Sequence, residues 1–336
     1  MLDRAIDQPR APGGRFRNLD GSAPAGLGTV LRWAVWDRLT GVRRRAPDRA
    51  RVPRVAPDLT RLATPPGEGE PARLTWLGHA SFLVQLDGVS LLVDPVLGDR
   101  LFGGIPRNVP PGVSPADLPA IAATLVSHSH YDHLDLPSVR AVGAPVVGGL
   151  GLARWFRARG LEATELGWWG STRVGEVRVT FVPAQHWSRR GLADTNETLW
   201  GGFVIEGSAS TLYHAGDSAY FAGFREIGAR FPAIDAALLP IGAYDPGWFM
   251  LRQHMDPEQA LQAFEDVGAR TFVAMHWGTF KLADEPLDEP PRRLEAERVR
   301  RHLPQERVRV LAVGETLEVA RPPAPARAAP DAAPPR

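Results

Sequence analysis

Short apolar runs rich in β-branched residues recur along the chain from about Ala72 onward, and turn-forming residues separate them. Such runs predict β-strands, and Asp87-Gly88 between two of them predicts a hairpin. The expected strands cover residues 73–77, 81–86, 89–94, 122–126, 145–147, 162–166, 177–182, 200–206, 211–214, 236–240 and 271–275, with a last hairpin around Gly314 within residues 308–319.

Helical segments are expected between these strands. Asp256, followed by Pro257 and Gln259, is a strong start signal, because it combines a capping side chain with a proline at the first helical position. The expected helices cover residues 136–142, 150–159, 221–231, 256–267 and 290–303. Strands and helices follow one another in two similar halves. This order predicts an α/β fold in which two sheets pack face to face with helices on both outer sides.

The two ends of the chain differ in composition from this body. Residues 1–70 are rich in Pro, Gly and Arg, which predicts an N-terminal arm with one short helix. Residues 71–320 are expected to form the domain, and the Pro- and Ala-rich residues 321–336 a disordered tail. Within the domain, residues 95–119 contain many prolines and predict a long loop, a kind of segment that is usually functional or flexible.

The predicted arm helix covers residues 27–40 and carries an apolar stripe. Its members at helical spacing are Leu27, Val30, Leu31, Ala34 and Val35, and the basic residues Arg43, Arg44 and Arg45 follow. Two interpretations remain open. The stripe packs on the body of the protein, or residues 27–45 make peripheral contact with an anionic membrane surface.

Composition narrows the class of protein. The chain has 336 residues, 44% of them hydrophobic, a formal net charge of +1 and no cysteine. This balance gives no overall basic field for nucleic acid, and the lack of cysteine excludes disulfides and thiolate metal sites. Residues 1–7 lack the apolar segment of a signal peptide. No run approaches the roughly 18 to 20 apolar residues that span a bilayer. We expect a cytoplasmic protein that is either soluble or attached to a membrane surface only peripherally.

One short stretch concentrates metal-binding side chains. The predicted strand 122–126 leads into Ser127-His128-Ser129-His130-Tyr131-Asp132-His133, which contains a His-x-His-x-Asp-His pattern. Imidazole and carboxylate together suit zinc, with iron and manganese as alternatives. A single tetrahedral zinc needs three or four ligands, and this loop already supplies four. Further candidates downstream therefore favour two metal ions.

Three more predicted strands end in a candidate ligand, namely His186, Asp217 and His276. Two zinc ions would use the whole set. The expected assignment is His128, His130 and His186 for one ion, Asp132, His133 and His276 for the other, and Asp217 as the bridge. Three further residues have open roles. His79 supports a ligand or makes a structural hydrogen bond, and Asp94 and Asp135 are candidates for orienting a ligand imidazole.

These motifs resemble the metallo-β-lactamase-fold hydrolases. The His loop followed by His186, Asp217 and His276 in that order carries the resemblance to the superfamily. Other segments are similar to N-acylphosphatidylethanolamine phospholipase D, over roughly residues 70–285. They are Trp76-Leu77-Gly78-His79-Ala80, Pro183-Ala184-Gln185-His186-Trp187, His214-Ala215-Gly216-Asp217-Ser218, His254-Met255-Asp256-Pro257 and His276-Trp277-Gly278-Thr279-Phe280.

The resemblance implies a four-layer αββα sandwich and a di-zinc phosphodiesterase. The expected reaction is of the phospholipase D type, on N-acylphosphatidylethanolamine or a related phospholipid, through a hydroxide that bridges the metals. Asp132 and Asp217 would be catalytic through the metals, and His254 would be a catalytic and substrate-site residue near the phosphate or the leaving group. Trp187, Trp248 and Phe249 lie in loops beside the ligands and are expected to bind substrate, although a core role is the alternative.

Other functions are compatible with the same ligands. A lactonase or a hydrolase of small phosphoesters needs the same metals without a site for lipid. A non-catalytic metal-binding protein is the alternative from another class, and the complete ligand set argues against it. A nuclease is disfavoured because no basic patch is evident in the sequence. The sequence does not indicate the oligomeric state.

Overall fold

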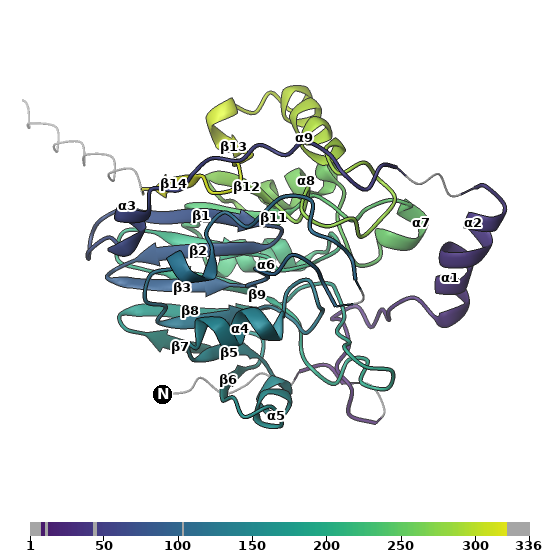
Figure 1. Cartoon of the computed structure of the whole chain (residues 1–336), viewed down its shortest axis with the longest axis horizontal. Helices are drawn as coiled ribbons and strands as arrows, with labels where there is room; N and C mark the ends of the chain where they lie inside the picture. The colour runs from purple at the N-terminus through teal and green to yellow at the C-terminus, as the bar shows by residue number, and fades with distance from the viewer. Residues whose placement is uncertain (1–7, 11–12, 43–45, 103, 321–336) are drawn as a thin grey trace, which may run out of the picture.

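The computed structural model describes residues 8–10, 13–42, 46–102 and 104–320. Two seven-stranded sheets pack face to face, and helices cover their outer sides (Figure 1). This arrangement confirms the predicted α/β sandwich. The Arg43 to Arg45 cluster and the tail 321–336 lie outside the described residues.

The first sheet has the strand order β14-β1-β2-β3-β4-β5-β6. Its β14 to β3 half is antiparallel, and β3 to β6 run parallel to one another. The strands are β1 (Ala72–Gly78), β2 (Ser81–Leu86), β3 (Val89–Val93), β4 (Ala123–Val126), β5 (Val146–Gly149), β6 (Ala163–Leu166) and β14 (Thr316–Val319).

The second sheet has the order β13-β12-β11-β10-β9-β8-β7. Here β7 to β10 are antiparallel and β10 to β13 are parallel. The strands are β7 (Ser171–Val174), β8 (Val177–Val182), β9 (Gly202–Glu206), β10 (Thr211–His214), β11 (Ala236–Pro240), β12 (Thr271–Met275) and β13 (Val308–Arg309). Strand β7 has no counterpart among the strands predicted from the sequence. This edge strand is partly exposed and lacks the apolar run that marks the others.

Alternating side chains build the layers. In β2, Phe82 and Val84 belong to the large core cluster that both sheets share, whereas Leu83 belongs to a cluster on the opposite face. Leu62 from the short helix α3 (Leu59–Ala63) completes that outer cluster. Successive residues of a strand point to opposite faces of its sheet, so a strand covered on both sides is apolar throughout.

The remaining helices divide between the two outer faces. Val139 of α4 and Phe156 of α5 pack on β4 and β5, and Phe224 of α6 and Phe264 of α8 belong to the core of the second sheet. Helix α9 packs on α8. The bounds are α4 (Leu136–Val142), α5 (Leu152–Arg157), α6 (Gly223–Arg230), α7 (Gly247–Met250), α8 (Pro257–Val267) and α9 (Glu289–Arg300), with 3-10 turns η2 (Pro115–Asp117) and η3 (Gln305–Arg307).

The predicted hairpin at residues 308–319 is wrong. Val308 pairs with β12 in the second sheet, whereas Thr316 pairs with β1 in the first. The turn around Gly314 therefore carries the chain from one sheet to the other instead of folding it back on itself. Both short strands lie at sheet edges, and an edge strand gains more by pairing with an open neighbouring edge than by forming an isolated hairpin.

The N-terminal arm contains more structure than the predicted single helix. A continuous helical segment comprises α1 (Leu27–Leu31), the π-helical turn η1 (Arg32–Trp36) and α2 (Asp37–Leu39), at the right of Figure 1. A second helix, α3, begins at Asp58, whose side chain accepts a hydrogen bond from the backbone N of Arg61. Such a cap contributes about 1 kcal/mol. Among the residues that the structure describes, the helices are too short or too polar to span a bilayer.

Candidate metal centre

Four strands from both sheets end at the same edge of the sandwich. β4 of the first sheet leads into the loop 128–133, and β8, β10 and β12 of the second sheet lead to His186, Asp217 and His276. All of the residues predicted as metal ligands fall into groups whose nitrogen and oxygen atoms lie within 4.8 Å of one another. The fold thus brings together ligands that are far apart in the sequence.

Three imidazoles form the first group, and their ring nitrogens face one another. Nδ1 of His130 lies 2.9 Å from Nε2 of His128 and 3.1 Å from Nε2 of His186. Nδ1 of His186 donates a hydrogen bond to the backbone O of Gln253 at 2.7 Å, which leaves a lone pair on Nε2. Neutral ring nitrogens with facing lone pairs need a proton or a cation between them. The first group therefore has the arrangement of a cation site.

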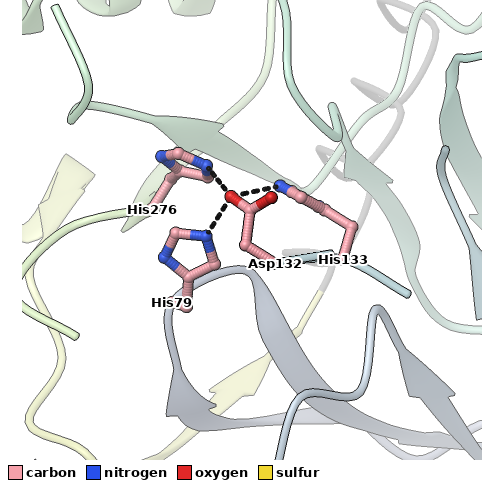
Figure 2. A group of neighbouring side chains, drawn as sticks. All are labelled: His79, Asp132, His133 and His276. Atoms are coloured by element: carbon pink, nitrogen blue, oxygen red, sulfur yellow. Dashed lines mark hydrogen bonds and ion pairs between the residues drawn. The ribbon is translucent and has the colours of Figure 1, made fainter. Parts of the chain in front are cut away.

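The second group surrounds the carboxylate of Asp132 (Figure 2). Oδ2 of Asp132 lies 3.0 Å from Nε2 of His79 and 3.4 Å from Nε2 of His276. Nε2 of His133 lies 3.7 Å from the same oxygen. The group contains the three residues predicted for the second ion and adds His79, whose role the sequence left open.

The carboxylate of Asp217 lies between the two groups. Its Oδ1 is 3.1 Å from Nε2 of His276, and its Oδ2 is 3.2 Å from Nε2 of His133. The same Oδ2 is 3.9 Å from Nε2 of His128 and 3.8 Å from Nε2 of His186. One buried carboxylate thus reaches both groups, as a bridging ligand must.

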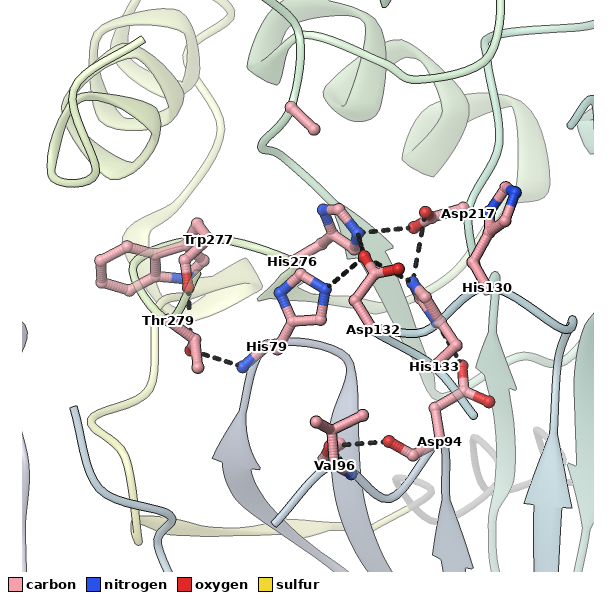
Figure 3. A network of polar contacts seen from close by, with 12 residues as sticks. His79, Asp94, Val96, His130, Asp132, His133, Asp217, His276, Trp277 and Thr279 are labelled. Carbon is pink, nitrogen blue, oxygen red and sulfur yellow. Dashed lines mark hydrogen bonds and ion pairs between the residues drawn. The ribbon is translucent and has the colours of Figure 1, made fainter. Parts of the chain in front are cut away.

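Asp94 holds His133 from behind the site (Figure 3). Oδ2 of Asp94 accepts from Nδ1 of His133 at 2.8 Å and from the hydroxyl of Ser127 at 2.6 Å. This contact fixes the ring and directs its Nε2 into the centre. Asp135, the other candidate for this role, instead accepts from the backbone N of Ser138 and caps α4.

Two histidines of the second group have left-handed backbone conformations, with φ of 54° at His79 and 63° at His276. The backbone N of His276 donates to the backbone O of His79 at 3.0 Å. The backbone N of His79 in turn donates to Oγ1 of Thr279 at 2.7 Å, a contact that Figure 3 also shows. Left-handed conformations cost non-glycine residues about 1–3 kcal/mol each, so surrounding contacts must hold them. These hydrogen bonds are part of that support.

Burial keeps the histidines of the first group neutral. It lowers the pKa of His130 to about 4. Burial and the neighbouring imidazoles lower the pKa of His128 and of His186 well below the ordinary value of 6.5. A neutral imidazole is the form that binds a metal ion. At neutral pH the nitrogens of this group that would bind a cation therefore do not need to lose a proton first.

The second group behaves in the opposite way. Burial opposes a charge on His133, but the carboxylates of Asp217 and Asp132 outweigh it and raise the pKa of that ring well above 6.5. Against the same opposing burial, Asp217 and Asp132 raise the pKa of His276 to about 9. Both rings are therefore positively charged imidazolium groups at pH 7 in the metal-free protein. Their charge compensates the two carboxylates, a role that a bound cation would otherwise fill.

Several buried polar atoms of the site lack a hydrogen-bond partner among the described residues. They are Nε2 of His130, Nε2 of His133, Nε2 of His276, Oδ1 of Asp217 and Nδ1 of His254. Buried polar atoms are normally paired, so a cluster of unpaired ones calls for an explanation. Cations bound among the ligands would satisfy Nε2 of His133, Nε2 of His276 and Oδ1 of Asp217, and this ligand chemistry fits zinc, iron or manganese.

A cavity of about 760 Å³ opens onto the two groups. His130, Asp132, Asp217 and His254 form its polar end, and Nδ1 of His254 lies 3.8 Å from Oδ2 of Asp217. The rest of its lining is largely apolar and comes from five separate segments. The apolar lining includes Val30, Trp33, Leu101, Phe102, Ile105, Trp187, Leu192, Phe249, Met250 and Leu282.

Most of the predicted substrate-binding residues line this cavity, and one of them does not. His254, Trp187 and Phe249 line it, whereas Trp248 is not among its lining residues in the described part of the chain. Trp248 is 41% exposed, and the guanidinium of Arg32 lies over its ring. Within the short helix α7, Phe249 and Met250 line the cavity, whereas Trp248 lies on the exposed side of the helix.

The arm contributes to the wall of this cavity, and the sequence did not predict this contribution. Val30 and Trp33 form part of its wall, and the ring of Trp33 stacks on Phe249 at 5.0 Å. Nε1 of Trp33 donates to Asp284. Helical spacing identified the segment but did not indicate its partner. The long loop 95–119 supplies further wall residues. Its unusual length had already indicated a functional or flexible segment.

Arg190 is a further residue of the site that no pattern in the sequence indicated. Its Nη1 donates to the backbone O of Ser129 at 2.9 Å and of Leu134 at 2.6 Å, so it fastens both ends of the His loop. The guanidinium also lies over the ring of Tyr131 at 4.1 Å. Arginine is well suited to such multiple contacts because its donors form a rigid planar fork.

Comparisons with known proteins agree with this geometry. A sequence profile described as the beta-lactamase superfamily domain matches residues 90–277. An uncharacterized protein of Mycobacterium tuberculosis is 38% identical over 87% of this chain and 80% of its own length. A metal-dependent hydrolase of Opitutus terrae is 34% identical over 74% of this chain and 100% of its own. The N-acyl-phosphatidylethanolamine-hydrolyzing phospholipase D 1 of Caenorhabditis elegans is 38% identical over 62% of this chain and 64% of its own.

Solved structures share the fold. A possible metal-dependent hydrolase from Veillonella parvula aligns with a TM-score of 0.61 at 16% identity, over 74% of this chain and 100% of that one. An isothiocyanate hydrolase from Delia radicum gut bacteria aligns with a TM-score of 0.60 at 22% identity, with the same coverage. At such identities the likeness concerns the architecture of the sandwich.

Proposed function

We propose that this chain, which belongs to the beta-lactamase superfamily and is a metal-dependent hydrolase of that fold, is a di-zinc phosphodiesterase of the phospholipase D type. The observation that carries the proposal is the apolar cavity of about 760 Å³ that ends at the two His/Asp groups. A phospholipid would match both parts of this site. Its apolar acyl chains match the walls of the cavity, and its anionic phosphodiester matches the polar end. The named activity of the similar Caenorhabditis elegans enzyme supports the same substrate class.

The proposed ligand assignment follows the two groups. His128, His130 and His186 would hold one ion, Asp132, His133 and His276 the other, and Asp217 would contact both. When bound, two zinc ions would polarise a phosphoryl oxygen and make water a nucleophile near neutral pH. Asp94 would keep His133 oriented throughout, because its carboxylate already holds the far side of that ring.

The reaction consumes one water. Its oxygen forms a bond to phosphorus, the P–O bond to the head-group alcohol breaks, and a proton reaches the departing oxygen. With N-acylphosphatidylethanolamine the products are phosphatidic acid and an N-acylethanolamine. The apolar walls of the cavity would hold acyl chains and exclude bulk water from the polar end.

His254 is proposed to contact the phosphate or the departing oxygen. It lines the cavity, and its Nδ1 has no hydrogen-bond partner in the described part of the chain. Burial lowers its pKa to about 4, so the ring is neutral at pH 7. A neutral imidazole keeps one N–H donor and one acceptor, so its N–H suits a hydrogen bond to a phosphate oxygen or to the departing oxygen, and its other nitrogen suits accepting a proton from water.

A substrate panel tests this function directly. Zinc-loaded protein should hydrolyse glycerophospholipids, with N-acylphosphatidylethanolamine among the best, and leave lactones and nucleotide diesters intact. Mass spectrometry of the products would identify which P–O bond breaks. Hydrolysis of lactones or of small phosphoesters in preference to lipids would support the alternative function instead. Metal binding without turnover of any panel member would support a non-catalytic protein.

The arm is proposed to contact the membrane that holds the substrate. Val30 and Trp33 face the cavity, while Leu31, Trp36 and Leu39 are 51%, 65% and 79% exposed. One short helical segment thus has an inner face on the cavity and an outer apolar face in solvent. Apolar and aromatic residues beside a lipid cavity favour an interfacial position.

Vesicle flotation would test the outer face. The double substitution Trp36→Ser and Leu39→Ser should lower binding to phosphatidylethanolamine/phosphatidylglycerol vesicles by roughly tenfold or more, since full burial of one such side chain contributes about 1.5–3 kcal/mol. Val299→Ser is the control, because Val299 is also an exposed apolar residue, at 55%, but lies on α9 and not on the helical segment 27–39. Equal binding of the double variant and the control would contradict the membrane contact.

A further inference from the structure

The first part of the arm is bound to the body at a particular place. Residues 13–22, here called the strap, run along the loop that follows β8. The backbone N of Phe16 donates to the backbone O of Asn196 at 2.9 Å, and Nη2 of Arg15 donates to the backbone O of Ala193 at 2.6 Å. Phe16 is 3% exposed. The strap is therefore packed like part of the domain.

Asn18 is the centre of this contact. The residue is buried, and its Oδ1 accepts hydrogen bonds from the backbone N of His186 and from Nε1 of Trp200, both at 3.1 Å. Its Nδ2 donates to Oγ of Ser22 at 3.1 Å. Both partners of Oδ1 are N–H donors, which fixes the orientation of the amide. Asn18 thus pairs a buried backbone N–H of a proposed metal ligand.

The strap also holds the residue before that ligand. Nε2 of Gln185 donates to Oδ2 of Asp20 and to Oγ of Ser22, both at 2.8 Å. On its other side, the backbone of Gln185 is tied to the Asp217 loop, because its N donates to Oγ of Ser218 and its O accepts from the N of Ala219. The end of β8 is therefore clamped between the arm and the neighbouring ligand loop.

We infer that Asn18 is a positioning residue for the metal centre, acting through the backbone of His186. This inference rests on the proposed role of His186 as a ligand. Without Asn18, the buried N–H of His186 loses its partner, and a buried unpaired donor is unfavourable enough to displace the chain. The first group, which contains His186, should loosen, whereas no hydrogen bond among the described residues joins the strap to the group around Asp132.

The test compares three variants of the full-length protein. Asn18→Leu removes the acceptor at similar size. Asn18→Asp keeps an acceptor oxygen, and the Ser22 hydroxyl can turn to donate to it. Gln8→Leu is the matched control, because Gln8 is also a buried amide of the arm, but its Oε1 accepts from the backbone N of Trp168, which is not a proposed metal ligand. Ser22→Ala serves as a milder probe should Asn18→Leu fail to fold.

Cobalt is the probe metal. Each protein is loaded with Co²⁺, and its visible spectrum and its release of metal to a chelator are followed. In Asn18→Leu, one of two equivalents should be retained about 10- to 100-fold less tightly, as found for residues that orient ligands, and the spectrum of that site should change. Asn18→Asp and Gln8→Leu should behave like the wild type, and Ser22→Ala should shift in the same direction as Asn18→Leu by a smaller factor.

The outcomes distinguish a failure of the proposed function from a failure of the inference about Asn18. Wild-type protein that takes up no Co²⁺ would overturn the proposed function and this inference with it. If the wild type takes up two equivalents and Asn18→Leu releases them identically, the inference alone is overturned. Equal effects in Asn18→Leu and Gln8→Leu would also overturn it, because they would assign the effect to docking of the arm in general.

Discussion

Replacement of Asp217 by asparagine is expected to lower turnover of the best phosphodiester by about 10³-fold or more, since loss of a single electrostatic contact in an active site already costs about 10²–10³-fold. The substitution keeps the size of the side chain but removes its charge. Oδ1 and Oδ2 lie 3.1 Å and 3.2 Å from the rings of His276 and His133, so an amide would direct a hydrogen atom at one of them. Both groups should lose affinity for metal together.

Metal content should be measured beside turnover, by elemental analysis of protein purified without added metal. The matched control is Asp235→Asn, because Asp235 is also a buried aspartate, directly before β11, and accepts from the backbone N of Thr211. An Asp217→Asn protein with normal activity and normal metal content would remove the bridging role. A fall in activity with full metal content would point to a role in the chemistry alone.

Removal of metal should abolish activity and reduce stability. A ligand present at 100 times its dissociation constant stabilises the folded state by about 2.7 kcal/mol at each site. Without cations, the unpaired atoms of His133, His276 and Asp217 lose their compensation. Dialysis against a chelator, followed by a thermal melt and an assay, measures both effects, and addition of Zn²⁺ should restore them. Full activity after complete removal of metal would exclude the proposed mechanism.

The pH dependence of the metal-free protein should differ in sign from that of metal binding. The pKa of His276 is raised to about 9, and that of His133 also lies well above 6.5. A raised pKa in the folded state stabilises the protein fully below the unfolded value of about 6.5, and this contribution disappears as the pH rises through the folded value. Between pH 7 and about 9, the metal-free protein should therefore lose stability.

Metal affinity should rise over the same interval, because each of these rings must lose its proton before its Nε2 can bind a cation. Titration calorimetry of the metal-free protein in buffers of different ionisation enthalpy would count the released protons at pH 7. The count should fall as the pH approaches 9. A metal affinity that is constant from pH 7 to 9 would contradict this assignment of protons.

Much of the site could be predicted because the sequence places it at strand ends. The apolar strand before His128 and the strands before His186 and His276 were recognisable by their β-branched residues, and strands of facing sheets bring their ends to a common edge. The fold, with its two sheets and outer helices, followed from the same pattern. The metal-binding role of these residues stays a prediction until metal content is measured.

The rest depends on contacts that leave no local pattern. Asn18 and Arg190 are single polar residues in irregular segments, and their importance comes from backbone groups more than 50 residues away. Trp248 and Phe249 are neighbours in sequence, yet only Phe249 lines the cavity. The crossing from β13 to β14 was mistaken for a hairpin because a turn between two short strands has the same sequence signature in both cases.

The cavity walls and the metal ligands come from different kinds of structure. The ligands follow strands of the sandwich, whereas the apolar walls come from the arm helix, the 95–119 loop, the loop near residue 190, the short helix α7 and Leu282. Irregular segments tolerate substitution and insertion far better than packed strands do. During evolution, such a lineage can exchange the molecule that it accepts while its reaction chemistry is inherited unchanged. Divergence within this superfamily is thus expected first in the walls.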